Sequence, residues 1–192
     1  MDFSESVLAR RSIRRYRQQP VGADVLRQLI EFARVAPSGR NAQSLRFCVI
    51  SRPELVKSVF DLTAWAGYVT PRRSPVWGKD APPCFIAVTT RQDVRSTVVH
   101  ADAGAAIENI LLGAASLGLG TCWIGAFDKE KVRRLLPVAE GVEVLYLVAV
   151  GYPAETPVLE DAPGEDRIRY YLDEEDRLHV PKLTADDLTT WA

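Results

Sequence analysis

The sequence contains few of the side chains that serve as nucleophiles or metal ligands. Its 192 residues include three cysteines and two histidines. Cys48, Cys84 and Cys122 are odd in number, far apart and set in apolar runs, which predicts buried thiols in a reducing compartment and neither disulfides nor zinc ligands. His100 and His179 lie far apart, and neither belongs to an obvious motif with a cysteine or carboxylate. Hydrolase and metalloenzyme interpretations therefore have little support, and we expect no metal.

The sequence also has no large excess of positive or negative charge. The formal net charge is −1 and 47% of the residues are hydrophobic, as in an ordinary globular protein. Nucleic-acid-binding proteins usually have a clear basic excess, so we expect no nucleic acid as a partner. The first residues contain no apolar core typical of a secretory signal, which predicts a cytoplasmic protein.

The longest apolar stretch, residues 101–117, predicts a helix that is buried on nearly all sides. A membrane span is the rival interpretation, but Asp102 alone would cost about 2.5–3.5 kcal/mol near the centre of a bilayer. We therefore expect no membrane partner, and we place this helix at the centre of the core or at a subunit contact. Gly118 and Gly120 predict where the helix ends.

The rest of the chain up to residue 151 alternates between helix and strand signals. Asp24 can cap a helix that ends before a turn-rich loop at residues 36–41, and Ser51 with Glu54 matches a capping box. Residues 67–83 are rich in proline and predict a long loop that is functional or mobile. We predict further helices at residues 3–11, 53–66 and 128–136, and strands at residues 45–50, 84–90, 121–124 and 142–150.

Residues 152–192 differ in character from the rest. The part up to residue 176 is strongly acidic, and residues 168–172 are its only β-like segment. A disordered tail is one interpretation, but the apolar content favours an arm packed on the body or on a partner subunit. We therefore treat residues 1–192 as one domain with a C-terminal arm.

Arg10, Arg11 and Arg14 form a dense cationic cluster, with Ser12 between them. Guanidinium groups bind phosphate oxygens bidentately, and a hydroxyl adds a further donor. A solvated basic helix end would have the same composition, because cations favour the C-terminus of the helix dipole. For the cluster alone, the solvated helix end is the stronger interpretation.

A turn at residues 37–43 also has the composition of a binding loop. It offers backbone amides, a hydroxyl and side-chain amides, a set that suits a planar heterocycle. A plain helix-to-strand connection would use the same residues, so both interpretations stay open. The glycines at 118, 120 and 125 do not form a dinucleotide fingerprint, because they follow a helix and precede a strand.

In their order and spacing these pieces resemble the FMN-dependent nitroreductase family of NAD(P)H-dependent flavin oxidoreductases. The resemblance covers residues 10–153. It rests on the segments RRSIR at 10–14, APSGRNAQ at 36–43, DAGAAIEN at 102–109, GLGTCWIGAF at 118–127 and VAVGYP at 148–153.

The resemblance implies an α+β fold whose central, mainly antiparallel sheet is flanked by helices, in an intertwined homodimer. It further implies an FMN oxidoreductase that transfers hydride from NADH or NADPH to an electron-poor small molecule, nitroaromatic or quinone-like. An FMN-binding module for storage, sensing or electron delivery, without NAD(P)H turnover, is the alternative. Steady-state oxidation of NAD(P)H would distinguish the two.

The resemblance also assigns residues to the cofactor. In the family, the segment that matches Arg10, Arg11, Ser12 and Arg14 holds the ribityl phosphate and one flavin edge. The Pro-Ser loop reaches in from the other subunit, and a backbone amide after the GLG turn meets the reactive flavin nitrogen. No catalytic side chain is implied. The other cofactor-binding residues implied in this chain are Pro37, Ser38, Gly39, Asn41, Trp123, Ile124, Gly125, Ala126 and Lys182.

The sequence departs from the family pattern at three places. Residues 44–45 are Ser-Leu where better-studied members carry Pro-Trp, and Gly125 stands where many carry glutamate, so only a backbone contact is implied there. A basic pair in the family's C-terminal tail is missing, and Lys182, or else Arg167 and Arg169, would have to replace it.

Overall fold

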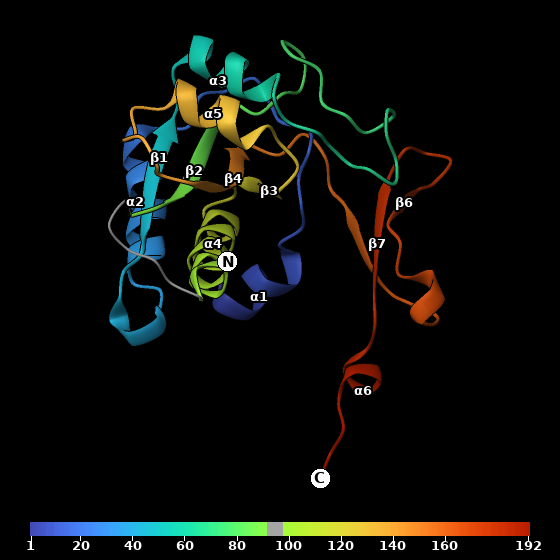
Figure 1. Ribbon diagram of the computed structural model, residues 1–192. Helices are drawn as coiled ribbons and strands as arrows, with labels where there is room; N and C mark the ends of the chain where they lie inside the picture. Colours follow the sequence, from blue (N-terminus) through green and yellow to red (C-terminus); the bar gives the residue numbers. More distant parts are fainter. Residues whose placement is uncertain (92–97) are drawn as a thin grey trace.

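A four-stranded antiparallel sheet forms the centre of the protein. Figure 1 shows the computed structural model, which describes residues 1–91 and 98–192. The two central strands are buried along nearly their whole length, as expected for continuous β-branched and aliphatic runs. The strand order is β1 (Leu45–Ile50), β2 (Cys84–Thr90), β4 (Val144–Gly151) and β3 (Gly120–Ile124), and each neighbouring pair is antiparallel.

Helices cover both faces of this sheet. On one face, α2 (Ala23–Arg34) and α4 (Val99–Ser116) pack against side chains that include Val148. On the other face, α3 (Pro53–Phe60) and α5 (Lys129–Leu135) pack against side chains that include Leu147. Successive residues of β4 thus point to opposite faces, as the period of a strand requires. The predicted α+β fold with a mainly antiparallel central sheet is confirmed.

The strands were predicted closely, and the helix ends less well. β1 and β2 have the predicted bounds. The third helix was predicted to reach residue 66, but α3 ends at Phe60 because the chain turns and the Leu62 N–H donates to the Val59 carbonyl at 3.0 Å. Its N-cap is Arg52 without a side-chain hydrogen bond, so the predicted capping box at residues 51–54 was wrong.

Two further helix starts and ends differ from the prediction. The α2 N-cap is Gly22 rather than Asp24, which lies in the first turn, where its charge still suits the helix dipole. The first helix, α1 (Phe3–Ala9), ends earlier than predicted because Arg10 has the extended angles φ −58° and ψ 122°. The arginine cluster therefore lies mostly on an extended segment and not on a helix end.

The long apolar helix α4 is not buried on all sides within one chain. Its buried residues include Asp102 and Ile107, which face the core. A stripe that includes Ala105, Glu108 and Leu112 is partly exposed. The predicted burial on nearly all sides is therefore wrong for the single chain.

The C-terminal arm forms a second, three-stranded sheet that Figure 1 shows to one side of the main sheet. In it, β5 (Val158–Asp161) is parallel to β7 (Leu178–Lys182), and β6 (Tyr171–Leu172) is antiparallel to β7. Only these last two residues of the predicted β-like segment 168–172 are strand. Beyond a short helix, α6 (Ala185–Leu188), the tail extends away from the body.

The loop at residues 67–83 lies between the body and the arm (Figure 1). It contains no helix or strand, as predicted. The Tyr68 and Tyr170 rings are 5.0 Å apart, and Arg73 Nη1 lies 3.0 Å from the Asp176 carboxylate. The loop thus contacts the arm through both rings and charges.

Candidate functional site

The arginine cluster lies along the side of β3 that faces away from β4, at the edge of the sheet. Ser12 forms a parallel bridge with Thr121, and the Ile13 N–H donates to the Thr121 carbonyl at 2.8 Å. A Cβ on Gly120 would lie 2.7 Å from Ile13 Cγ1, so the glycine is what allows this close approach. The segment at residues 10–14 is therefore held beside the strand that leads to Trp123.

Arg10 and Arg11 line one cavity of about 190 Å³, together with residues 118–121 and Thr156. Arg10 Nε lies 3.4 Å from a Glu108 carboxylate oxygen. Arg11 differs, because its Nε is buried and has no hydrogen-bond partner within the described residues. Burial, and secondly the charge of Arg10, lowers the pKa of Arg11. Arg11 is thus a partly desolvated cation that forms no ion pair with a carboxylate of residues 1–91 or 98–192, as an anion-binding site requires.

Arg14 lines a second cavity, of about 220 Å³, and all four residues from Trp123 to Ala126 line the same cavity. Its guanidinium carbon lies 5.0 Å from the centre of the Tyr170 ring. The Gly125 N–H donates to no other residue in the described part of the chain. The cavity therefore combines a cation and an available backbone donor.

Aromatic side chains border this second cavity. Trp123 packs edge-on against Tyr146, with ring centres 5.1 Å apart, and Trp65 also lines the cavity. The Tyr146 hydroxyl lies 3.2 Å from His100 Nδ1. Burial raises the pKa of the nearby Cys122 thiol to about 11, so this cysteine is not a reactive nucleophile. The site has rings and donors, and no activated nucleophile.

The loop at residues 37–43 is fixed by the buried carboxylate of Asp102. The Gly39 N–H and the Ser44 hydroxyl donate to its two oxygens, at 2.9 and 3.0 Å. Three residues of this loop that are not glycine have positive φ, a strained conformation that is common at functional sites. They are Arg40, Asn41 and Gln43.

Within one chain this loop is separate from the arginine cluster. Pro37 and Ser38 line a third cavity, of about 280 Å³, whose lining shares no residue with the cavities of Arg11 and Arg14. Lys182 lies at the exposed end of β7 and lines none of these three cavities. The predicted cofactor residues are therefore brought together only in part.

Comparisons with known proteins decide the family. Residues 7–152 match the sequence profile of the nitroreductase family. A relative from Methanothermobacter thermautotrophicus, assigned as an NADH dehydrogenase/NAD(P)H nitroreductase, is 30% identical over 88% of this chain and 86% of its own. The chain belongs to the nitroreductase family.

Other family relatives agree in sequence and fold. The FMN reductase [NAD(P)H] of Bacillus subtilis is 26% identical over 94% of this chain and 76% of its own. A protein of Desulfovibrio desulfuricans, assigned as a nitroreductase and solved in complex with FMN, is 28% identical with a TM-score of 0.68. That alignment covers 86% of this chain and 94% of the other. The family fold thus extends over most of the chain.

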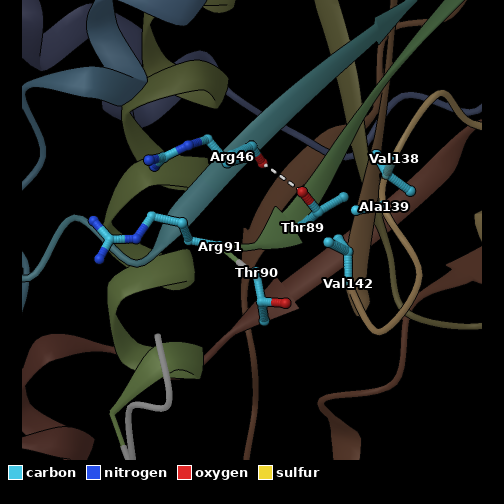
Figure 2. Close-up of a pocket in the computed structure, with 7 residues that line it drawn as sticks. All are labelled: Arg46, Thr89, Thr90, Arg91, Val138, Ala139 and Val142. Carbon is cyan, nitrogen blue, oxygen red and sulfur yellow. Dashed lines mark hydrogen bonds between the residues drawn. The ribbon is translucent and has the colours of Figure 1, made fainter. Parts of the chain in front are cut away.

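Figure 2 shows a further cavity of this nitroreductase-family protein, of about 780 Å³, at the ends of β1 and β2. Arg46 and Arg91 line it, and in this view both point away from Val138 and Val142. The Thr89 hydroxyl donates to the Arg46 carbonyl at 3.3 Å. None of the predicted cofactor residues lines this cavity, so it lies outside the candidate site.

The described part of the chain offers neither a metal-binding cluster nor a membrane-spanning helix. Among residues 1–91 and 98–192, no group of histidine, cysteine and carboxylate side chains could hold a metal ion. No helix in that part of the chain is long and apolar enough to cross a membrane.

Sequence reasoning about this nitroreductase-family chain missed two buried carboxylates. In the sequence, Asp102 serves only as an argument against a membrane span and as the start of a family-matching segment, and Glu155 has no predicted role. A charged residue in an otherwise apolar helix is a signal of a paired buried charge, and it could have identified Asp102. Glu155 lies in an acidic segment, where nothing distinguishes it from its neighbours.

Proposed function

We propose that this protein is an FMN-dependent oxidoreductase that transfers hydride from NADH or NADPH to an electron-poor small molecule, nitroaromatic or quinone-like. The family supports this function, as do the names of the relatives: an NAD(P)H nitroreductase and an FMN reductase. The FMN complex of the D. desulfuricans protein supports the cofactor.

The observation that carries the proposal is that Arg14 and the segment from Trp123 to Ala126 line one cavity. FMN needs cations at its phosphate and donors along its ring edge. The partly buried Arg11 guanidinium, whose buried Nε has no partner among the described residues, would suit the phosphate, with Arg10 and the Ser12 hydroxyl beside it. Arg14 and the residues from Trp123 to Ala126 would line the ring.

FMN, when bound, would supply the hydride-transfer chemistry, while the protein supplies binding, orientation and electrostatics. The Gly125 N–H would donate toward the flavin nitrogen and stabilise negative charge that develops there. Trp65 and Trp123 would exclude water from the ring. No side-chain acid or nucleophile is needed, in keeping with the high pKa of the Cys122 thiol.

A homodimer would complete the site. Because the third cavity shares no lining residue with the cavities of Arg11 and Arg14, we propose that Pro37, Ser38, Gly39 and Asn41 act on the site of a second copy. The partly exposed stripe of α4 supports such an interface, as do Phe3 and Leu8 of α1, whose exposed fractions are 75% and 66%. Because Lys182 lines neither the cavity of Arg11 nor that of Arg14, we propose that it reaches the phosphate of the second copy.

The dimer has its own test. Sedimentation of the flavin-loaded protein at micromolar concentration should give twice the mass of the chain. A stable, flavin-loaded monomer would contradict the dimer and, with it, the proposed role of the loop at residues 37–43.

We further propose that the chain acts in the cytoplasm, as one domain with its arm.

Visible absorption of the purified protein, followed by separate additions of NADH and NADPH, tests the function. We expect the spectrum of bound flavin, about one FMN per chain, and its bleaching by at least one of the two nicotinamides. Released FAD, or no flavin after reconstitution, would contradict the cofactor. A protein that binds FMN but oxidises neither nicotinamide would be a storage, sensing or electron-delivery module instead.

A further inference from the structure

Glu155 joins three segments of the chain through one buried carboxylate. Its side chain is only 3% exposed. Oε1 accepts hydrogen bonds from the backbone N–H groups of Arg14 and of Arg15, the latter at 3.1 Å. Oε2 lies 2.8 Å from Nη2 of Arg73, whose side chain is 4% exposed. A single carboxylate thus connects the end of β4, the arginine segment and the loop at residues 67–83.

The position of Glu155 relates it to both cavities of the candidate site. Glu155 lines the cavity of Arg10 and Arg11. It also accepts a hydrogen bond from the backbone N–H of Arg14, whose side chain lines the cavity of Trp123. The neighbouring Ile13 N–H is bound on the opposite side of the segment, to the Thr121 carbonyl. The backbone at Ile13 and Arg14 is therefore held by two partners, Thr121 of β3 and Glu155.

A carboxylate beside an anion site raises an electrostatic problem, because its negative charge would repel a phosphate. The Arg73 guanidinium offsets that charge within the low-dielectric interior, where charge interactions are strong. Arg73 is in turn held by Asp176 of the arm, through its carbonyl at 3.0 Å and its carboxylate at 3.0 Å. The loop and the arm therefore help to hold Arg73 beside Glu155.

We propose that Glu155 is a positioning residue of the cofactor site, which holds the Arg14 backbone so that its guanidinium faces the cavity of Trp123. Arg73 keeps the charge of Glu155 from opposing the phosphate in the cavity of Arg10 and Arg11, which Glu155 also lines. This inference rests on the proposed FMN function. It goes beyond that function by assigning roles to Glu155 and Arg73, two residues outside the set proposed to bind the cofactor.

Two double variants separate the two roles. Arg73→Met with Glu155→Gln removes both charges and keeps a carbonyl oxygen that can accept from the Arg14 and Arg15 amides. Arg73→Met with Glu155→Ala removes both charges and the acceptor. The single variant Arg73→Met keeps the acceptor and leaves the carboxylate charge without its guanidinium. Asp61→Asn, in an exposed ion pair with Lys57 on α3, is the matched control.

The measurement is titration of each apoprotein with FMN, followed by flavin fluorescence. We expect Asp61→Asn and the Gln–Met double variant to bind FMN within about threefold of the wild-type protein. The Ala–Met double variant and the single Arg73→Met variant should bind about tenfold or more weakly, which corresponds to about 1.4 kcal/mol. Equal binding by both double variants would overturn the positioning role, and unchanged binding by Arg73→Met would overturn the charge role.

Hydrogen exchange gives a readout that does not need FMN. In the apoproteins, the amides of Arg14 and Arg15 should exchange about tenfold faster in the Ala–Met variant than in the Gln–Met variant, because only the first lacks the acceptor. A general loss of stability would instead speed exchange at the core strand β4 as well. Equal exchange of the two amides in both variants would contradict the inference.

Further controls keep the result decisive. If the Ala–Met variant does not fold, Glu155→Asp replaces it, because the shorter side chain keeps the charge but draws the carboxylate back from the amides. Wild-type FMN affinity in Glu155→Asp would then overturn the positioning role. Failure of the wild-type protein to bind FMN would refute the proposed function itself. Normal wild-type binding with unaffected variants would refute only this inference.

Discussion

The side chain of Ile13 occupies the space that a Cβ on Gly120 would need. The distance from that Cβ position to Ile13 Cγ1 would be 2.7 Å, shorter than real contacts of this kind. Because Ile13 lies between Ser12 and Arg14, the size of residue 120 controls how closely the arginine segment approaches β3. The absence of a side chain at Gly120 thus allows the arginine segment to take its position in the candidate site.

Replacing Gly120 by alanine should therefore displace the arginine segment. We expect a loss of about 1–3 kcal/mol in the free energy of unfolding, as for other overpacked sites, together with weaker FMN binding. Denaturant unfolding and FMN titration measure the two effects. Gly67→Ala is the control for stability, because a Cβ there meets nothing within 4 Å. Equal stability of the Gly120→Ala protein and the wild-type protein would show that the segment can move at no cost.

Arg11→Met should weaken FMN binding without destabilising the apoprotein. Loss of a charge-assisted hydrogen bond costs about 1.5–3 kcal/mol, or roughly ten- to a hundredfold in affinity. Stability should change little, because the described residues place no carboxylate in an ion pair with Arg11, its Nη1 donates to the carbonyl of the adjacent Arg10, and methionine keeps an apolar stem of similar length. Arg134→Met, at an exposed ion pair with Glu130 and outside the cavities of the candidate site, is the matched control for FMN affinity. A stability loss with unchanged FMN affinity would assign Arg11 to the fold alone.

Gly125→Pro tests the backbone donor. Proline has no N–H, so the donor is removed outright. If FMN binding is retained, we predict a lower reduction potential of the bound flavin and slower reduction by NAD(P)H, because the donor would stabilise the added negative charge. Potentiometry and stopped-flow absorbance measure these quantities. An unchanged potential and rate would remove Gly125 from the mechanism.

The arm should be sensitive to pH through His179. Its Nδ1 lies 2.8 Å from Glu160 and its Nε2 lies 3.1 Å from Asp173, and hydrogen bonds to these carboxylates, Glu160 first, raise the pKa of His179. A histidine whose pKa is raised by folding stabilises the folded arm fully below its unfolded pKa of about 6.5. That stabilisation is lost as the pH rises through the higher folded pKa.

Hydrogen exchange of β7 at a series of pH values tests this expectation. Exchange corrected for its intrinsic pH dependence should show less protection above the folded pKa than below pH about 6. His179→Gln should remove the dependence, because glutamine does not titrate. A pH dependence that survives in His179→Gln would point to another group.

The strands could be predicted from the sequence because their signals are local. β2, with the sequence CFIAVTT, is rich in β-branched residues and begins with an apolar run, and its bounds follow directly. The end of α3 could not be predicted in the same way. Thr63 leaves the helical direction to form a bridge with Phe127, which is distant in sequence, and no local signal announces such a bridge.

The candidate site likewise has a part that could be predicted from local sequence and a part that could not. The segments of Arg11 and Trp123 could be identified because their residue types and order resemble a family. The hydrogen-bond partners of Asp102 and Glu155 could not be identified, because they lie 58 to 63 and 140 to 141 positions away in the sequence. A buried carboxylate is defined by what surrounds it, and only the folded chain supplies those surroundings.

Trp65 and Trp123 border one cavity, whereas Trp191 is 87% exposed near the end of the chain. A ligand that absorbs near-ultraviolet light and occupies this cavity would take excitation energy from the first two indoles. Trp191 would keep the emission of an indole in water. Of the four tryptophans, Trp65 and Trp123 therefore report occupancy of the cavity and Trp191 reports the tail, while Trp77, beside Phe60, adds an emission that reports neither.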